Sequence, residues 1–559
     1  MTKLIMVFIA AFVAVLNAEV IVTTPNGKIR GRQEYSQRKI SFYAFQQIPF
    51  AKPPVGSLRF KAPIPVEPWS EILNATKNDR VCFQQKYPFP GKEIPQNEDC
   101  LYLNVYTPVD PSKIVSPLPV MFYIHGGGFV TGASHIDFHG PHYLMEHGVI
   151  IVTTNYRVGL FGFLSTGDTV IPGNNGLKDQ LLALKWVQKN IEHFGGDKTK
   201  VTIFGQSAGS ASVTYQLMSE KSKGLFRAAI AQSGSILCPW AFQRDYRQIA
   251  YKLSIALDPT FSPSASSQKL LELLQSKSAK EINDAGLSLM SKTDFDNQMV
   301  QGFQFTPVIE PNHDDAFITK KMYDALINGD MQRVPLIIGI CSEEMIINAL
   351  DLKAFKQTAS SLDSDLSLLV NNNMHVSDKT KKLEIGGNIK KIYTNNSFIN
   401  GIGYAVQFYS DQSFAIPIIH HAKKQSLFSD VYFYQFSYYG AIQGPRPYME
   451  GAYKVGHSDD EMYVWAFLNN SNLDSNPKSD VLTSDRFRTL FTNFAKTLNP
   501  VSDKTELLGI NSWPKVTPNE FQYLDMNETF TIKKDLKKRV YDAWINIYEK
   551  DAIKPYDTF

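Results

Sequence analysis

Residues 194–209 read FGGDKTKVTIFGQSAG, and their last five residues form the pattern G-x-S-x-G around Ser207. The four residues before this pattern, Val201–Phe204, are β-branched or apolar, as a buried strand requires. The residues after it are mostly small or apolar and can continue as a helix. A strand, a tight turn and a helix in this order predict a nucleophile elbow, in which the serine hydroxyl is exposed at the top of a sheet. An incidental G-x-S-x-G in a turn is the alternative.

A serine hydroxyl is too weakly acidic to attack an ester at neutral pH, so a histidine must take its proton. After such an elbow, an acid and then a histidine follow along the chain. His457 lies in a glycine-containing loop after a strand-rich stretch and is the favoured base. His420 and His421 fall in a helical pattern and are expected on a helix surface, while His375 lies in a polar loop.

The candidate acids are Glu343 and Glu344, which follow the apolar strand pattern at Pro335–Ile340. Neighbouring residues of an extended segment point in opposite directions, so one carboxylate could reach the histidine while the other faces solvent. The residues alone leave the choice between the two open. A buried carboxylate at this point would hold the imidazole in its productive tautomer and stabilise its charged form.

A run of three glycines, Gly126–Gly128, follows the strand pattern at Pro119–Ile124. Glycines let the backbone approach a reacting carbon closely, so two of these amides and the amide of Ala208 could bind an oxyanion. A plain flexible turn is the alternative. The glycine run, the elbow, the acids and the histidine occur in the order that an ester hydrolase needs, and this favours the functional interpretation.

The chain has 559 residues, of which 43% are hydrophobic and 20% charged, a composition typical of a globular protein. A net charge of +3 and scattered basic residues argue against binding to nucleic acid. Apolar strand patterns alternate with helical stretches such as Asp179–Phe194, which predicts an α/β fold with an open, largely parallel sheet. The basic run Lys533–Arg539 is expected on the outer face of a C-terminal helix. The remaining strand patterns are Val149–Asn155, Ala228–Ser233 and Val431–Phe436.

The first residues of the chain, 1–18, have the form of a secretory signal peptide, with Lys3 before an apolar stretch and Ala18 at the cleavage site. An apolar stretch of about a dozen residues is too short to span a bilayer. We therefore expect a secreted protein with no membrane anchor, in which residues 19–559 form a single domain. Four N-x-[ST] sequons fit this route. They are Asn74, Asn395, Asn469 and Asn527.

The chain has four cysteines, which allow three pairings, and none of their spacings suggests a metal site. Cys82 and Cys100 bracket a segment rich in Pro, Gln and Lys that is typical of a loop, and a disulfide there fits a secreted protein. Cys238 and Cys341 lie in apolar surroundings, as buried free thiols do.

Several long segments together resemble the type-B carboxylesterase/cholinesterase family of α/β-hydrolases, over nearly the whole mature chain. The resemblance implies an α/β-hydrolase fold, in which helices flank a large, mostly parallel central sheet with insertions. It also implies hydrolysis of carboxylic esters through an acyl-serine, with no metal or organic cofactor. The segments are Glu98–Pro108, His125–Phe129, Asn155–Ser165, Asn174–Val187, Phe194–Gly209 and Ala231–Ser235.

The family pattern also implies roles for single residues. It makes Ser207 the nucleophile, Glu344 the acid and His457 the base. It supports a Cys82–Cys100 disulfide and resembles members in which the cysteine at position 238 is unpaired. The oxyanion donors that it implies are Gly127, Gly128 and Ala208.

Three residues depart from the family pattern. Lys454 and Met345 stand where glycine is usual, and Lys198 stands where proline is frequent. The lysine and the methionine are close in sequence to the base and to the acid, and so bear on the geometry around His457.

The expected partner is a small, uncharged ester. The segment between Cys82 and Cys100 contains no Trp, and Gln206 replaces the glutamate that precedes the nucleophile of cholinesterases. Both differences remove features that attract a quaternary ammonium group. The sequence GQSAG is similar to that of insect juvenile hormone esterases, so hydrolysis of juvenile hormone is a more specific alternative. No oligomeric state is predicted.

Two other functions compete with an esterase. A catalytically silent binding protein of the same family is the first, although relatives of that kind typically lack the serine, the histidine or the glycines that this chain retains. A serine peptidase on the same fold is the second, because the fold does not determine the substrate.

Overall fold

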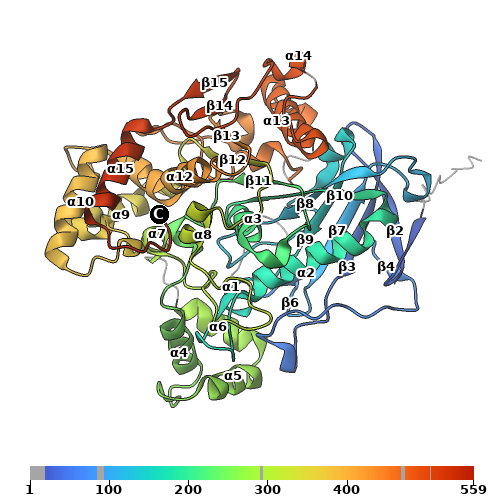
Figure 1. The fold of residues 1–559 in the computed structure, drawn as a ribbon, viewed down its shortest axis with the longest axis horizontal. Helices are drawn as coiled ribbons and strands as arrows, with labels where there is room; N and C mark the ends of the chain where they lie inside the picture. Colours follow the sequence, from blue (N-terminus) through green and yellow to red (C-terminus); the bar gives the residue numbers. More distant parts are fainter. Residues whose placement is uncertain (1–18, 85–93, 290–293, 468–471, 504) are drawn as a thin grey trace, which may run out of the picture.

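The computed structural model describes residues 19–84, 94–289, 294–467, 472–503 and 505–559. The expected signal peptide, residues 1–18, and the sequon at Asn469 lie outside these ranges. One large sheet extends through the described part of the chain, from its first strand to its last (Figure 1).

Most strands belong to this sheet, and β5 and β6 form a small separate pair. The strands are β1 Glu19–Thr24, β2 Gly27–Tyr35, β3 Ser41–Pro49, β4 Leu73–Asn74, β5 Val81–Cys82, β6 Gln96–Asn97, β7 Tyr102–Thr107, β8 Leu118–Ile124, β9 Ile150–Thr154, β10 Gly196–Gln206, β11 Ala228–Gln232, β12 Leu336–Cys341, β13 Val431–Phe436, β14 Gln522–Met526 and β15 Phe530–Lys534.

The strand order of the large sheet is β1-β2-β3-β7-β9-β8-β10-β11-β12-β13-β14-β15, and β4 pairs with β2. All pairs from β9 to β14 are parallel, whereas the pairs from β1 to β9 and the pair β14–β15 are antiparallel. The predicted parallel sheet is therefore confirmed at its centre, and antiparallel strands extend it at both edges.

Successive side chains of the central strands enter two different cores. In β8, Val120, Phe122 and Ile124 belong to one core. Met121 and Tyr123 belong to the other, as the alternation of a strand requires. Helices α2 (Asn175–Asn190) and α3 (Ala208–Met218) contribute to the first core, and α13 (Lys478–Thr497) contributes to the second (Figure 1). The sheet is thus covered on both faces, as in an α/β-hydrolase.

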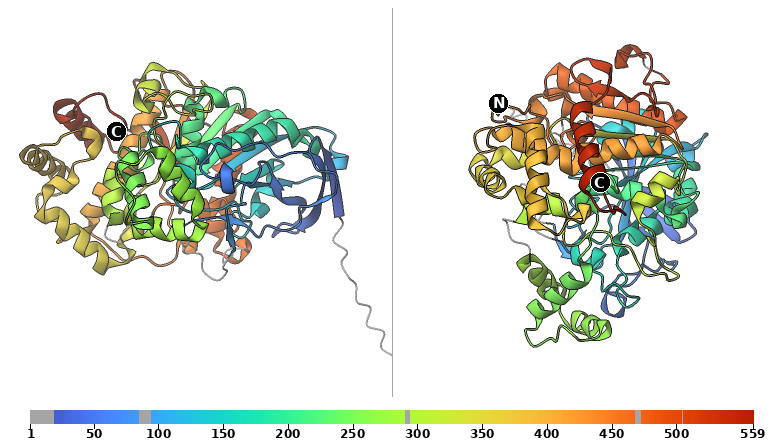
Figure 2. Two further views of the ribbon diagram at one scale, coloured as in Figure 1. Left: turned by 90° about the horizontal axis from the view of Figure 1, so that it is seen from below. Right: turned by 60° about the vertical axis from the view of Figure 1, so that its left-hand side comes forward.

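The other helices lie mainly in two long insertions, one between β11 and β12 and one between β12 and β13 (Figure 2). The first contains the green helices α4 to α8, and the second contains α9 to α12 together with a π-helix, Asp411–Ala415. The bounds are α1 Gly159–Phe163, α4 Tyr246–Leu257, α5 Ser267–Ser276, α6 Ala279–Ser288, α7 Asp294–Gln301, α8 Met322–Asn328, α9 Leu352–Ser364, α10 Lys379–Tyr393, α11 Ile402–Ser410, α12 Ile416–Gln425, α14 Thr505–Leu508 and α15 Lys538–Asp551.

The apolar patterns located the central strands correctly, but the C-terminal basic run was assigned wrongly. The predicted strands lie within one residue of the bounds of β8, β9, β11, β12 and β13, and β10 extends the elbow strand back to Gly196. Lys533 and Lys534 belong to strand β15, and helix α15 begins only at Lys538. The pairing of β15 with β14 places Lys533 and Lys534 in a strand, whereas Lys538 and Arg539 lie on the C-terminal helix as expected.

The expected disulfide is present between Cys82 and Cys100, with an S–S distance of 2.06 Å. It closes a segment of which residues 85–93 lie outside the described part of the chain. Cys238 and Cys341 are buried free thiols, as expected, and burial raises the pKa of each.

Candidate active site

The turn after β10 has the geometry of a nucleophile elbow. Ser207 has φ 57° and ψ −122°, a conformation that residues other than glycine rarely adopt. Backbone strain of this kind is concentrated at functional sites. A Cβ at Gly205 would meet the Gly209 carbonyl at 2.6 Å, and one at Gly209 would meet the Ile124 carbonyl oxygen at 1.9 Å. The flanking glycines are therefore required because the turn packs directly against the end of β8.

Three side chains form a continuous hydrogen-bonded chain behind this turn. The Nε2 atom of His457 lies 2.8 Å from Ser207 Oγ, and its Nδ1 atom lies 2.7 Å from Glu344 Oε2. The other oxygen of Glu344 accepts a hydrogen bond of 2.8 Å from the backbone amide of Cys341. These hydrogen bonds connect His457 to residues that are 113 positions away (Glu344) and 250 positions away (Ser207) in the sequence. This arrangement suits proton transfer from the hydroxyl to the imidazole, with the carboxylate orienting the ring.

The direction in which each side chain leaves the segment after β12 determines which of the two neighbouring glutamates reaches the histidine. Both follow β12, and Glu344 points to His457 while Glu343 points away from it. The expectation that the second carboxylate faces solvent was wrong, because Glu343 is only 2% exposed. Its Oε2 accepts a hydrogen bond from Ser342 Oγ at 2.6 Å, and burial raises the pKa of its carboxyl group.

The other candidate histidines lie away from the serine. His420 and His421 lie on α12 as expected, but they are buried and not on the helix surface. His421 Nδ1 lies 2.7 Å from Ser235 Oγ, and His420 Nδ1 lies 2.8 Å from the Tyr541 hydroxyl. Burial lowers the pKa of both imidazoles, to about 4 for His421 and about 3 for His420, so both are neutral packing residues.

The glycine run after β8 lies beside the serine, as the sequence predicts for an oxyanion site. Gly127 and Gly128 have φ values of 106° and 61° and line the same cavity as Ser207. Ala208 is the first residue of α3, so its amide has no acceptor within the helix. His125 precedes the glycines and is stacked on Tyr156 with a ring separation of 4.3 Å. Burial lowers the pKa of His125 to about 3, so it stays neutral.

The serine and the histidine open into a cavity of about 520 Å³. Its walls are largely apolar, and the carboxylates among them are engaged by other groups. Asp459 forms an ion pair of 2.5 Å with Arg446, and Glu461 accepts hydrogen bonds from the Tyr123 hydroxyl and from His139. The apolar lining side chains include Trp240, Met299, Phe303, Met345, Ile347, Phe414, Met462 and Phe467.

Two contacts of His457 were not predicted from the sequence. The ring of Phe414 lies 4.7 Å from the imidazole, and the amide Nε2 of Gln206 lies 3.2 Å from His457 Nε2 and 2.8 Å from Ser458 Oγ. Phe414 belongs to the π-helix, a form that often occurs at functional sites but has no sequence signal here. The sequence predicts only a role in substrate selection for Gln206, whereas the structure places its amide against the imidazole of His457.

Asp460, three residues after His457, is a buried structural residue. Its Oδ2 accepts hydrogen bonds from Tyr434 at 2.7 Å and Gln232 at 3.0 Å. Burial raises the pKa of Asp460 to about 6, against an ordinary value of 3.8. Burial likewise raises the pKa of Asp459 to about 6. These two acids fix the loop that carries His457.

The described residues show no group of three or more His, Cys, Asp or Glu side chains that could hold a metal ion. Among the described residues, no helix has the length and apolar character that a bilayer crossing requires.

The fold and the site define an α/β-hydrolase with a serine, a histidine and a carboxylate in hydrogen-bonded sequence. The chain belongs to the carboxylesterase family, whose pattern it matches over residues 18–544. It is a carboxylic-ester hydrolase, as the family and its named relatives establish.

Individual relatives extend over almost the whole chain. A juvenile hormone esterase of Tribolium castaneum is 34% identical over 536 residues, which cover 91% of this chain and 88% of the relative. Venom carboxylesterase-6 of Apis mellifera is 33% identical and covers 92% of this chain and 91% of its own length. The crystal structure of juvenile hormone esterase from Manduca sexta, with OTFP covalently attached, has a TM-score of 0.83 and 29% identity. It covers 95% of this chain and 100% of its own.

Proposed function

We propose that Ser207 is the nucleophile, His457 the general base and acid, and Glu344 the carboxylate that orients His457. One observation carries this assignment: the hydrogen-bonded chain from Glu344 through His457 to Ser207, with distances of 2.7 and 2.8 Å, at the floor of an open cavity. The strained φ of Ser207 supports it, because such strain persists where function needs it.

The reaction follows from this geometry in two halves. Ser207 Oγ attacks the carbonyl carbon of the ester while His457 takes the hydroxyl proton, and the amides of Gly127, Gly128 and Ala208 bind the oxyanion. The intermediate then expels the alcohol, which receives the proton from His457, and an acyl-serine remains. Water then attacks the carbonyl carbon of the acyl-serine while His457 takes a proton from the water. His457 returns this proton to Ser207 Oγ as the carboxylic acid leaves, and the serine hydroxyl is restored.

Replacement of the nucleophile tests the assignment. We expect Ser207→Ala to lower kcat for a simple aryl ester by about 10⁶-fold. A covalent serine-directed phosphonate should label the native protein and should not label the variant. Labelling of the variant, or turnover equal to that of the native protein, would overturn the assignment. Failure of the native protein to react would support the catalytically silent alternative.

The cavity also favours a class of substrate. Its apolar walls and its engaged carboxylates suit an uncharged ester with sizeable apolar groups, and they offer no free acid among the described lining residues for a quaternary ammonium. The relatives named juvenile hormone esterase make juvenile hormone one specific candidate.

An ester panel tests the substrate class. Values of kcat/KM should be higher for uncharged apolar esters than for choline esters of the same acyl group. Juvenile hormone belongs in the panel, and a value no higher than that for simple aliphatic esters would exclude the specific candidate. Matched amides should be poor substrates, and equal turnover of ester and amide would instead establish a peptidase.

We also propose that the protein is secreted, that residues 1–18 are removed, and that residues 19–559 form a single domain. The pattern of the first residues supports secretion, and the one sheet that runs from β1 to β15 supports a single domain. Three of the sequons, Asn74, Asn395 and Asn527, have exposed side chains. N-terminal sequencing of protein from the medium of a eukaryotic host should begin near Glu19, and retention of Met1 would contradict the proposal.

A further inference from the structure

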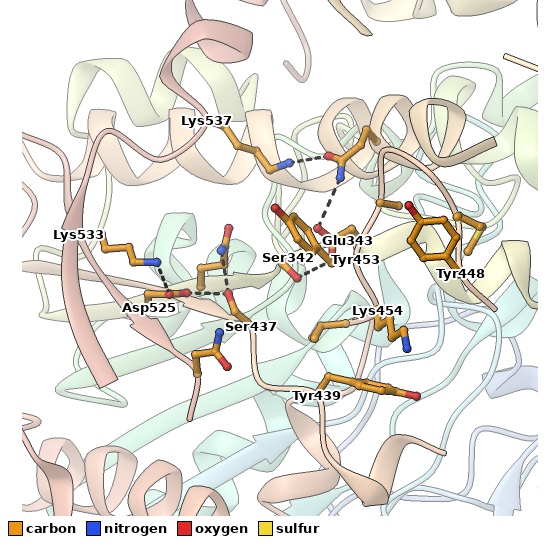
Figure 3. A pocket seen from close by; sticks show the side chains of 16 residues that line it. Ser342, Glu343, Ser437, Tyr439, Tyr448, Tyr453, Lys454, Asp525, Lys533 and Lys537 are labelled. Atoms are coloured by element: carbon orange, nitrogen blue, oxygen red, sulfur yellow. Dashed lines mark hydrogen bonds and ion pairs between the residues drawn. The ribbon is translucent and has the colours of Figure 1, made fainter. Parts of the chain in front are cut away.

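A second cavity, of about 700 Å³, lies beyond the segment that carries the two glutamates (Figure 3). Ser342 and Glu343 form part of its wall, and the hairpin β14–β15 and the loop before His457 form other parts. The two cavities lie close together along the chain here, since Glu343 lines this one and Met345 lines the catalytic one. Backbone hydrogen bonds from Glu343 to Val455 and from His457 to Glu344 tie this segment to the loop that carries His457.

The charges that line this cavity are mostly neutralised by neighbours. Lys533 pairs with Asp525 at 2.7 Å (Figure 3). Lys537 pairs with Asp411 at 2.7 Å. Lys454 lies over the ring of Tyr439 at 5.1 Å. Because burial raises the pKa of Glu343, its carboxyl group has a weakened preference for the charged form. A neutral ligand with many hydroxyl groups fits such a lining better than an ion does.

Two tyrosines at the rim of the cavity are unusually exposed. Tyr448 is 84% exposed and Tyr453 is 78% exposed, and both line the cavity together with Tyr439. The C–H face of a sugar ring stacks well on an aromatic ring, and its hydroxyl groups can bond to amides and hydroxyls. Gln435 and Ser437 offer such groups in the same wall. The cavity thus offers aromatic rings for stacking and polar groups for hydrogen bonds, the two kinds of contact that a carbohydrate makes.

The chain places a sugar attachment site in this wall. Asn527 lies in the turn between β14 and β15, where Met526 pairs with Phe530, and it begins the sequon Asn-Glu-Thr. It is exposed and lines the cavity. Asp525, near the end of β14, lines the same cavity. Asn527 Oδ1 accepts a hydrogen bond of 2.9 Å from the Glu528 amide, so Nδ2 is the atom available for attachment.

We propose that Asn527 carries an N-linked glycan whose first sugars fold back into this cavity and stack on Tyr448 and Tyr453. The inference rests on the secretory route proposed above. In that route Nδ2 replaces the lipid diphosphate at C1 of N-acetylglucosamine in a lipid-linked oligosaccharide, and Nδ2 loses one proton. The glycan covers two aromatic rings that are otherwise in water, and it occupies a cavity that the esterase mechanism does not use.

Site-by-site deglycosylation tests the proposal. The protein is secreted from a mammalian host and digested in its native state with peptide N-glycosidase in ¹⁸O-labelled water, and released sites are timed by peptide mass spectrometry. Asn74 and Asn395 are exposed sequons that do not line this cavity, and they serve as internal controls. We expect release at Asn527 to be about tenfold slower than at the controls, as for a glycan that is docked about 90% of the time.

A double variant, Tyr448→Ser with Tyr453→Ser, should bring the release rate at Asn527 to that of the controls. Equal rates at all sites in the parent protein, an unoccupied Asn527, or slow release that survives the double variant would overturn the proposal. If none of the sequons is occupied, both this proposal and the proposed secretory route are contradicted. Ester hydrolysis, measured on the same samples, reports separately on the catalytic assignment and should not change.

Discussion

Two cavities of similar size meet at one segment of this protein, and they use the same kinds of side chain differently. Glu344 bonds to His457, which lines the smaller cavity, whereas Glu343 lines the larger cavity and bonds to Ser342. On the catalytic side, hydrogen bonds converge on one reactive hydroxyl in apolar surroundings. On the other side, polar groups are paired with each other and aromatic rings lie in water.

The difference shows that neither the size of a cavity nor the presence of a buried acid identifies an active site. The larger cavity contains a carboxyl group with a raised pKa that bonds to the Ser342 hydroxyl, but no histidine is among the described residues that line this cavity. Convergence of groups with complementary roles is the more specific signal. Replacing equivalent groups on the two sides should therefore have very unequal consequences.

The largest contrast is expected between the two glutamates. Glu344→Gln should lower kcat by about 10⁴-fold, because an amide cannot both orient the imidazole and stabilise its charge. Glu343→Gln is the matched control, since it makes the same chemical change one residue away. Steady-state kinetics on a p-nitrophenyl ester measure both. Similar losses of kcat in the two variants would show that the glutamates act as one unit and would contradict the distinction between the two cavities.

The charge pairs around the larger cavity should matter for stability and not for chemistry. Lys537 and Asp411 are 16% and 1% exposed, so Lys537→Met leaves a buried carboxylate unpaired and should cost about 3–5 kcal/mol. Lys533→Met is the control, and its half-exposed pair with Asp525 should contribute within about 1 kcal/mol. Urea unfolding followed by tryptophan fluorescence gives both free energies. Equal losses would contradict the distinction between buried and exposed pairs.

The glycine loop on the catalytic side should be sensitive to a single methyl group. A Cβ at Gly127 would meet the Thr131 carbonyl oxygen at 2.2 Å, so Gly127→Ala must displace the loop and its amides. We expect kcat to fall by about 10²–10³-fold, the effect of losing one oxyanion donor. Gly444→Ala, at a similar positive φ but with open space around it, is the control. An unchanged kcat for Gly127→Ala would remove this loop from the proposed oxyanion site.

The smallest effect concerns pH and the loop that carries His457. Between about pH 4 and pH 6, folded Asp460 keeps a proton that the unfolded chain has lost, so this residue lowers stability as the pH rises through that window. The loss reaches about 3 kcal/mol at neutral pH. Asp460→Asn should therefore gain stability relative to the parent protein from pH 4 to pH 7 in urea unfolding. A difference that is constant with pH would contradict the assignment.

The fold was largely predictable from the sequence, and so was the position of the serine that is proposed to react, because these signals are local. The strand before Ser207 and the glycines around it occupy neighbouring positions, and their types follow from the tight packing of the turn. His420 and His421 show the limit, since a helical pattern says which residues form α12 and not which of its faces is covered. The basic run at Lys533 shows it again, because only pairing with β14 makes that segment a strand.

The sequence by itself predicted the elbow, the order of serine, glutamate and histidine along the chain, and the alternation of apolar strands with helices. The elbow and the alternation depend on residues that are close along the chain, and the order is given by the positions of the three residues. The tertiary structure decided that Glu344 and not Glu343 reaches His457, that Phe414 packs on the imidazole, and that Asn527 lies at the wall of a second cavity. These facts depend on the direction in which side chains leave strands and loops distant in sequence, and that direction is fixed only when the elements pack against each other.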